Sequence, residues 1–331
     1  MRVYKELVRY VLENGVRKKT RTGVDTLSVF SYSYRVNLND GYPLLTTKKM
    51  YFNSMLHELF WYLSGEEHIK EFRKKSKIWD AWANENGELE TAYGRFWRRY
   101  PVPEVSLPGE VFVDETNKYT KREENGQLVF DQIGYIIGTL KEMKKNPELM
   151  NGRRLVVSAW HPANATISKL PPCHYTFAFC VLGNKLNCHL TQRSGDIALG
   201  IPFNLACYSL LTMMIAKECG YELGEFSHTI IDAHIYVNHI AGLKEQLERE
   251  EYPLPKIEIN DKPFDKLTFS DIRLIGYKSH PVIKFDVAVW GTKKEDYHIF
   301  FFNITGKKSP TSAGGAMNCP IVSDIIKSVN I

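Results

Sequence analysis

The sequence predicts an α+β fold in which helices pack on one side of a mixed or largely antiparallel sheet. Two short runs of strand-forming residues, 177–181 and 186–190, flank Gly183-Asn184, which is a turn signal between paired strands. Residues 205–219 are apolar nearly all round and Gly220 follows them, a pattern typical of a central buried helix. A chain of 331 residues is long enough to bury both elements in one large core.

The other elements follow from apolar spacing, taken in chain order. Helical spacing predicts a helix that ends at Gly15, with inner positions Val3, Leu7, Tyr10 and Val11. Residues 26–37 alternate and are rich in β-branched and aromatic side chains, which predicts a strand. Residues 53–63 predict an amphipathic helix before Gly65, and its inner face holds Leu56, Leu59, Phe60 and Leu63.

The middle of the chain changes character twice. Prolines, glycine and mixed charge dominate residues 99–128, so we expect an insertion on the surface. Helical periodicity returns in residues 131–144, and residues 155–160 predict a strand.

Composition narrows the class of protein. Hydrophobic residues make up 44% of the chain, and 43 basic against 38 acidic residues give a net charge of +5. This mild excess is consistent with anionic small substrates and with ordinary surface charge. The six cysteines form no CxxC pair and no metal-ligand spacing with histidine, so no metal site is expected. No apolar run reaches the length of a membrane span, and we expect a reduced, cytoplasmic enzyme.

Cys173, in Leu-Pro-Pro-Cys-His, is the leading candidate nucleophile. The two prolines restrict its backbone approach, and the predicted hairpin would return Arg193 to its side. A nearby arginine favours the thiolate, which is the nucleophilic form of cysteine. Taken alone, a single cysteine is more often a small buried hydrophobic residue.

The wider pattern around this cysteine resembles the thymidylate synthase family from about Arg21 to Val289. The matching blocks, in the order of that family, are Arg21-Thr22-Gly23, 43–49 (PLLTTKK), 57–61 (HELFW), 78–82 (IWDAW), Tyr93-Gly94, Arg153-Arg154, Pro172-Cys173-His174, 192–194 (QRS) with Asp196, 199–204 (LGIPFN), 232–236 (DAHIY) and Gly276-Tyr277. Each block alone is weak, but their number, order and spacing together make an accidental match very improbable.

The resemblance implies reductive methylation of dUMP to dTMP with 5,10-methylenetetrahydrofolate. It implies a three-layer fold, a catalytic domain at residues 1–289 and a homodimer formed through a sheet face. In such enzymes a cysteine adds to C6 of the uracil ring and makes C5 nucleophilic. The alternative is a dUMP 5-hydroxymethylase, in which water instead of hydride reaches the C5 methylene and tetrahydrofolate is released.

The resemblance also assigns residue roles. Cys173 is the nucleophile, Glu58 a general acid and base acting through ordered water, Tyr93 assists removal of the C5 proton, and His174 belongs to a water network beside O4. The expected nucleotide ligands are Arg21, Arg193 and Ser194 around the phosphate, Asn204 on the base, and His234 and Tyr236 on the ribose, and Gln192 is also expected to bind the substrate. Arg153 and Arg154 are expected to reach the neighbouring subunit's site.

Asn204 and the folate-binding positions bear on specificity. An amide offers both a donor and an acceptor, which suits N3–H and O4 of uracil, whereas related dCMP hydroxymethylases carry Asp there. The expected folate contacts are Asp196 on the pterin, Lys48 on the glutamate tail, and a wall of Ile78, Trp79, Trp82, Leu199, Gly200 and Phe203. Each of these residues also has an ordinary structural explanation. Glu58 would be solvated, Lys48 would lie on the surface, and Arg153 and Arg154 would lie in a solvated turn. His234 and the aromatic residues would belong to the core.

The chain also departs from the family pattern. Residues 290–331 continue past the position where such enzymes end, so no carboxylate terminates at Val289. His161 and Ala178 replace the usual Asn and Gln, and we expect both near the site; Gly195 stands at a position taken as variable. A basic cluster at residues 73–77 leaves a nucleic-acid-binding regulator as a third hypothesis, disfavoured by the intact set of catalytic residues.

Overall fold

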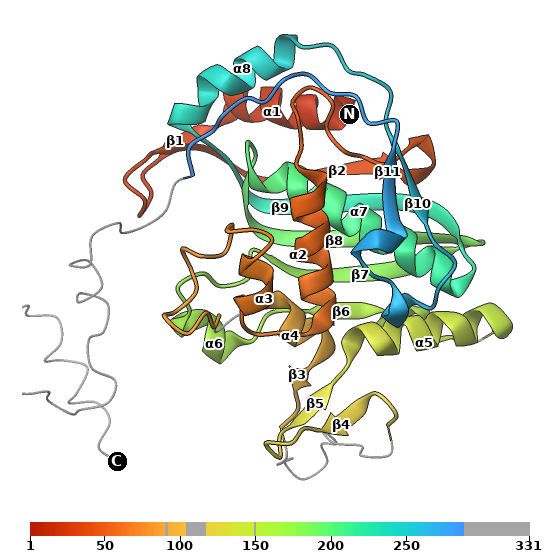
Figure 1. Cartoon of the computed structure of the whole chain (residues 1–331). Helices are drawn as coiled ribbons and strands as arrows, with labels where there is room; N and C mark the ends of the chain where they lie inside the picture. Colours follow the sequence, from red (N-terminus) through yellow and green to blue (C-terminus); the bar gives the residue numbers. More distant parts are fainter. Residues whose placement is uncertain (90–91, 104–116, 149, 288–331) are drawn as a thin grey trace, which may run out of the picture. The chain divides into compact units, whose positions relative to one another are not determined.

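A six-stranded sheet is the largest element of the computed structural model, which describes residues 1–89, 92–103, 117–148 and 150–287 (Figure 1). Its order is β1-β2-β9-β8-β7-β6, with β1 Val16–Lys18, β2 Thr26–Asn37, β6 Val156–Ser158, β7 His174–Leu182, β8 Lys185–Asp196 and β9 Glu222–Tyr236. Neighbours are antiparallel except β8 and β9, which are parallel. The sheet is therefore mixed, as predicted.

The hairpin of β7 and β8 is confirmed. Leu182 pairs with Lys185, so Gly183 and Asn184 form the turn, and Gly183 has φ 61° in the left-handed region. At the other end of the hairpin, His174 pairs with Gln192. The pairing therefore places the start of β7 and the end of β8, which carry the candidate site residues, at the same end of the sheet.

Strand β9 is the main element that sequence reasoning did not assign. It lies at the centre of the sheet between β2 and β8, and its inward positions include Phe226, His228 and Ile230, all fully buried. His228 interrupts an otherwise apolar inner face. Apolar alternation in residues 226–230 would have indicated the strand if the histidine had been counted as an inward residue.

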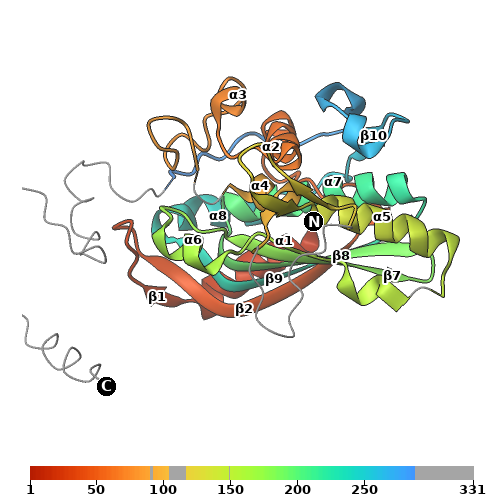
Figure 2. The same ribbon diagram turned by 90° about the horizontal axis from the view of Figure 1, so that it is seen from below.

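The predicted helices are present, and they cover one face of the sheet (Figure 2). They are α1 Arg2–Asn14, α2 Phe52–Ser64, α5 Gln132–Lys145 and α7 Gly200–Cys219. Helix α7 packs on β8 and β9 and is buried almost throughout, and α2 lies over α7. Gly65 and Gly220 end α2 and α7 with φ of 75° and 72°, which only glycine adopts readily.

Shorter elements complete the described structure. They are the helices α3 Lys70–Arg73, α4 Tyr93–Arg98, α6 Pro162–Ile167 and α8 Ile240–Glu248, the 3₁₀ turns Leu38–Asp40, Met150–Arg154, Val237–His239, Phe264–Lys266 and Phe269–Asp271, and the strand pair β10 Lys256–Ile259 with β11 Ile272–Ile275. Within the proposed insertion 99–128, β3 Tyr100–Pro101 and β4 Thr120–Arg122 pair with β5 Leu128–Phe130. Residues 104–116 and the extension 290–331 lie outside the described residues.

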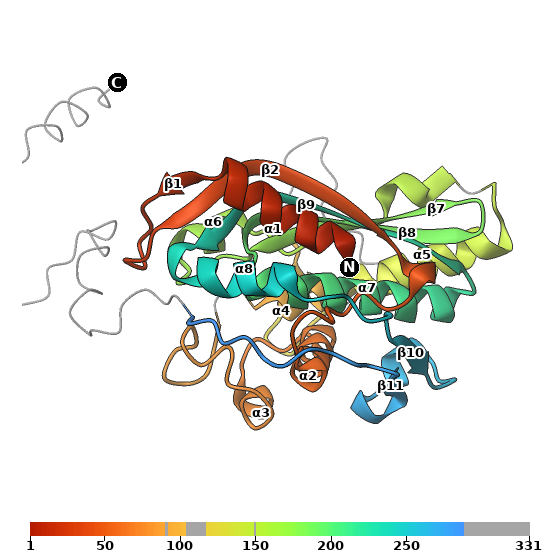
Figure 3. The same ribbon diagram turned by 90° about the horizontal axis from the view of Figure 1, so that it is seen from above.

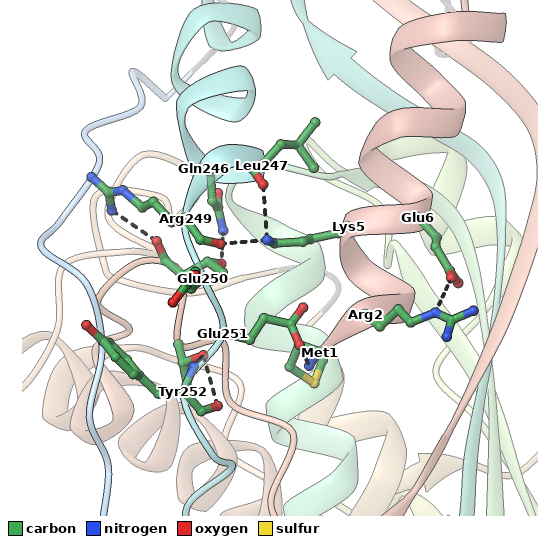
Figure 4. A network of polar contacts seen from close by, with 12 residues as sticks. Met1, Arg2, Lys5, Glu6, Gln246, Leu247, Arg249, Glu250, Glu251 and Tyr252 are labelled. Atoms are coloured by element: carbon green, nitrogen blue, oxygen red, sulfur yellow. Dashed lines mark hydrogen bonds and ion pairs between the residues drawn. The ribbon is translucent and has the colours of Figure 1, made fainter.

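Helices α1 and α8 lie side by side (Figure 3) and are joined by polar contacts (Figure 4). Lys5 Nζ donates to the carbonyls of Leu247 at 3.0 Å and Arg249 at 2.6 Å. Arg249 and Gln246 in turn donate to the backbone carbonyl and the hydroxyl of Thr47, at 3.0 and 2.9 Å. The end of α8 therefore fixes the segment that carries Lys48.

Candidate active site

Cys173 and Arg193 lie side by side, as the hairpin predicted. Arg193 Nη2 is 3.5 Å from Cys173 Sγ, and the Arg193 backbone N–H donates to the Cys173 carbonyl at 2.8 Å. The guanidinium also donates to the carbonyls of Pro171 at 2.6 Å and Pro172 at 3.0 Å. The two prolines therefore supply acceptors that hold the arginine against the thiol.

Arg193 lowers the pKa of the Cys173 thiol and so favours the thiolate, as predicted, but its effect is not the largest one. Burial raises the pKa of the Cys173 thiol, and this outweighs the lowering by Arg193, Tyr93 and Arg21. Desolvation disfavours the charged thiolate more than the nearby positive charges favour it. The thiol is therefore mainly protonated at neutral pH, and the arginines limit the size of the upward shift.

Tyr93 and His174 form a stacked pair beside the thiol. Their ring centroids are 3.9 Å apart with an interplanar angle of 7°. The Cys173 backbone N–H donates to Tyr93 Oη at 2.6 Å, and His174 Nδ1 lies 2.7 Å from Tyr208 Oη. Burial lowers the pKa of His174 to about 3, so its imidazole is neutral at physiological pH. Tyr208, on α7, is a contact that the sequence analysis missed.

Glu58 is buried, so the solvated alternative is wrong. Only 8% of its surface is exposed, and Trp79 Nε1 donates to its Oε1 at 2.7 Å. Burial raises the pKa of Glu58 to about 7, although hydrogen bonds from Trp79 and Tyr62 act in the opposite direction. A carboxyl group with this pKa can donate and accept a proton near neutral pH.

The aromatic residues next to Glu58 form a continuous group. Trp79 lies 5.7 Å from Trp82 and 5.8 Å from Tyr93 between ring centroids, both in edge-to-face geometry. Trp79, Trp82 and Phe203 are partly exposed and pack against the core. These three rings are therefore anchored in the core and still present an accessible aromatic surface. Ile78, which was predicted to belong to the same wall, is 44% exposed.

Asn204, near the start of α7, is tied to strand β8. Gln192 Nε2 donates to Asn204 Oδ1 at 3.1 Å and to the Ser194 carbonyl at 2.9 Å. Gln192 is 2% exposed, while Ser194 and Asn204 are half-buried. The structure therefore brings these three predicted residues together, with Gln192 acting as a support for Asn204.

Asp196 and Lys48 meet where β8 leads into α7. Asp196 Oδ1 accepts from the backbone N–H groups of Ala198 at 2.9 Å and Leu199 at 3.3 Å, next to Gly200. Lys48 is 4% exposed, its Nζ donates to the Ala198 carbonyl, and it lies 4.8 Å from the Phe285 ring centroid. Burial lowers the pKa of Lys48 to about 8, and Asp196 opposes that shift. Lys48 is thus no surface lysine.

The remaining residues predicted to bind the nucleotide come from the C-terminal end of β9 and from the connection between β1 and β2. His234 pairs with Asp196 across the strands and its ring lies 5.3 Å from that of Tyr236. Burial raises the pKa of Tyr236, which bonds to Thr22, and Arg21 opposes the rise. Because Arg21 also influences the Cys173 thiol, it lies at the same site.

Several predicted residues lie elsewhere. Arg153 and Arg154 are exposed just before the edge strand β6. Ala178 pairs with Val156 and His189 on the face of β7 opposite the buried Phe177 and Phe179, so the expected position near the site was wrong.

His161 and Gly195 have structural roles. His161 caps α6 by accepting from the Asn164 N–H at 3.4 Å. A side chain at Gly195 would approach Ile201 Cδ1 to 2.5 Å and Ile230 Cγ2 to 2.9 Å. Gly195 is therefore constrained by packing rather than freely variable.

The described residues give no support to metal binding. They hold no group of three or more His, Cys, Asp or Glu that could bind a metal ion.

Within the basic cluster 73–77, Arg73 pairs with Asp80 at 2.8 Å and Lys74 with Glu71 at 2.6 Å. Among the described helices, none is long and apolar enough to cross a membrane.

Comparison with known proteins identifies a family and a curated relative. The family described as thymidylate synthase matches residues 2–289. A curated protein named thymidylate synthase, from Haloferax volcanii, is 45% identical over 336 aligned positions, which cover 86% of this chain and 95% of that protein. The family match includes every residue assigned to the site.

Proposed function

The chain belongs to the thymidylate synthase family, and we propose that Cys173 is the nucleophile of its reaction. The enzyme is a one-carbon transferase that methylates dUMP to dTMP with 5,10-methylenetetrahydrofolate. The observation that supports Cys173 is its placement 3.5 Å from Arg193 Nη2 at the end of the hairpin. No other cysteine among the described residues lies beside an arginine in this way.

The proposed chemistry begins with addition of the Cys173 thiolate to C6 of the uracil ring. The addition makes C5 nucleophilic, because the electron pair displaced from the C5–C6 double bond is delocalised toward O4. Glu58, with a pKa of about 7, supplies the proton that stabilises O4 through water. Tyr93 assists removal of the C5 proton, and neutral His174 orders water next to O4. C5 forms the bond to the one-carbon unit of the folate co-substrate, and hydride transfer to that carbon expels the Cys173 thiolate, which releases dTMP.

The nucleotide contacts follow the same arrangement. Arg21, Arg193 and Ser194 bind the phosphate, His234 and Tyr236 bind the ribose, and Asn204, supported by Gln192, reads the base. A guanidinium pairs bidentately with phosphate oxygens, so Arg193 exchanges its prolyl carbonyl partners for the nucleotide in part. A buried, neutral site for the base and a cationic edge for the phosphate suit an anionic deoxynucleotide.

The folate contacts lie on the other side of Glu58. A flat bicyclic ring fits the partly exposed aromatic faces of Trp79, Trp82 and Phe203, with Ile78, Leu199 and Gly200 around it. Asp196 accepts from the pterin, and Lys48 faces the glutamate tail. When bound, the folate supplies the one-carbon unit and the hydride.

Product analysis tests the proposal. With dUMP and methylenetetrahydrofolate, we expect dTMP and dihydrofolate in equal amounts, because the aromatic wall keeps water from the C5 methylene. Mass spectrometry identifies the nucleotide and absorbance follows dihydrofolate, with a reaction lacking dUMP as the control. Hydroxymethyl-dUMP without dihydrofolate would contradict the proposal and support the hydroxymethylase alternative.

We further propose a homodimer that joins the open faces of two sheets. This face carries exposed apolar side chains, including Phe30 at 85%, Leu182 at 66% and Val156 at 49% exposure. Exposed apolar side chains on a sheet face are typical of a self-association surface. Arg153 and Arg154, exposed beside the edge strand, would then reach the phosphate in the partner's site.

Subunit complementation tests the shared arginines. Cys173→Ser subunits and Arg153→Ala/Arg154→Ala subunits are each expected to be inactive. Co-expressed, they should recover up to about one quarter of the wild-type activity, because half the dimers are mixed and each has one complete site. Mixing two lots of Cys173→Ser subunits is the control. A purified mixed dimer without activity would contradict sharing of the arginines.

The catalytic domain at 1–289 and a cytoplasmic location remain proposals. The five cysteines among the described residues are all free thiols, in agreement with a reducing compartment. Enzyme activity recovered in a membrane or extracellular fraction would contradict the location.

A further inference from the structure

Four side chains form a hydrogen-bonded series that runs from strand β2 to helix α7. Tyr34 Oη lies 2.8 Å from His228 Nδ1, and His228 Nε2 lies 3.1 Å from Gln192 Oε1. Gln192 Nε2 continues to Asn204 Oδ1 at 3.1 Å. Tyr34, His228 and Gln192 are 8%, 0% and 2% exposed, so water competes little for these bonds.

One backbone carbonyl sets the direction of the whole series. The Ser194 carbonyl, 2.9 Å from Gln192, can only accept a hydrogen bond, so the nitrogen of the Gln192 amide must face it. The Gln192 oxygen then faces His228 and needs a donor there. His228 Nε2 must therefore carry a hydrogen, and the second Gln192 N–H points to Asn204.

The same reasoning assigns a role to Tyr34. Burial lowers the pKa of His228 to about 3, so its imidazole is neutral and has one N–H. Since Nε2 holds that hydrogen, Nδ1 is an acceptor and receives the Tyr34 O–H. The tyrosine thus stabilises the histidine tautomer that donates to Gln192, because its O–H satisfies the acceptor nitrogen of that tautomer.

We propose that Tyr34 and His228 are positioning residues that hold the Asn204 amide in the orientation that selects uracil over cytosine. This inference rests on the proposed function, in which Asn204 reads the base. With Oδ1 held toward Gln192, Asn204 presents a donor to O4 and a second oxygen lone pair to N3–H of uracil. A flipped amide would suit the amino group and N3 of cytosine, but it would set two N–H groups against each other at Gln192.

The test is the selectivity of the Tyr34→Phe variant for dUMP over dCMP. The dissociation constant of each nucleotide is measured by calorimetric titration of the full-length protein. Loss of one buried neutral hydrogen bond is expected to lower the ratio of the dCMP constant to the dUMP constant about five- to tenfold. A merely structural role would weaken both nucleotides equally, and an unchanged ratio would overturn the inference.

Three further variants define the result. Tyr221→Phe also loses a partly buried hydroxyl, which donates to the Leu140 carbonyl at 3.0 Å, and should leave the ratio unchanged. In the His228→Gln variant, the new side-chain amide donates to Gln192 through an N–H group that does not depend on a tautomer. Adding Tyr34→Phe to this variant should therefore have no further effect. Equal effects of Tyr34→Phe in both backgrounds would contradict the proposed series. The Asn204→Asp variant tests the proposed function separately from the series. If it leaves the ratio unchanged, Asn204 does not read the base.

Discussion

Replacing Cys173 by serine is expected to lower kcat by about 10⁴-fold or more, with dUMP binding changed only a few-fold. A serine hydroxyl is far less acidic than a thiol, and an arginine 3.5 Å away cannot ionise it at neutral pH. The side chains proposed to contact the phosphate, ribose and base are other residues, so we expect dUMP binding to persist. Initial rates and calorimetric titration with dUMP measure the two effects separately.

The covalent step can also be observed directly. A dUMP analogue with fluorine at C5, supplied together with methylenetetrahydrofolate, cannot lose that substituent as a cation once C5 has taken the one-carbon unit. Its adduct should therefore persist and appear as added mass on the peptide that contains Cys173. Cys180→Ser, at an exposed thiol on β7, the strand that follows Cys173, should retain both activity and the adduct. Product formation by Cys173→Ser at more than a trace rate would refute nucleophilic catalysis by this residue.

Local sequence signals predicted the parts of the site that depend on neighbouring chain segments. The Gly183-Asn184 turn and the alternation on either side were enough to bring Arg193 near Cys173, because a two-residue turn fixes the register of both strands to within the one-residue shift between His174 and Thr176. The apolar stripe at residues 53–63 likewise predicted the inner face of α2, beside which the buried Glu58 lies. In both examples the interacting residues are close in sequence or share one element.

Properties that depend on distant segments could not be predicted in this way. The direction of the Cys173 pKa shift depends on burial by surrounding elements, which outweighs the adjacent charges. The series from Tyr34 to Asn204 requires β2, β9, β8 and α7 to be adjacent, and β9 was not assigned from the sequence. Ala178 was misplaced because its face of the strand follows from the bulge near His174 in the β7–β8 pairing.

The substitution Glu58→Gln is expected to lower kcat by about 10²- to 10⁴-fold, the usual contribution of a general acid or base. The amide keeps an oxygen that accepts from Trp79, so the packing of the pocket should persist. Wild-type activity should fall as pH rises through about 7, because the carboxyl group then loses the proton it donates. The pH profile of kcat measures this, and the variant should lack that limb.

The same substitution should stabilise the protein, which distinguishes a functional carboxyl group from a structural one. The folded-state pKa of about 7 lies above the ordinary 4.5, so the folded protein binds this proton more tightly than the unfolded chain. Ionisation therefore reduces stability progressively as pH rises from about 4.5, by about 3 kcal/mol once pH exceeds about 7. Denaturant unfolding of Glu58→Gln should show that gain above pH 7 and little below pH 4.5, whereas Glu13→Gln, at an exposed position on α1, should show neither effect. A variant that loses activity while its stability remains equal to wild type at every pH would contradict a buried, proton-binding Glu58.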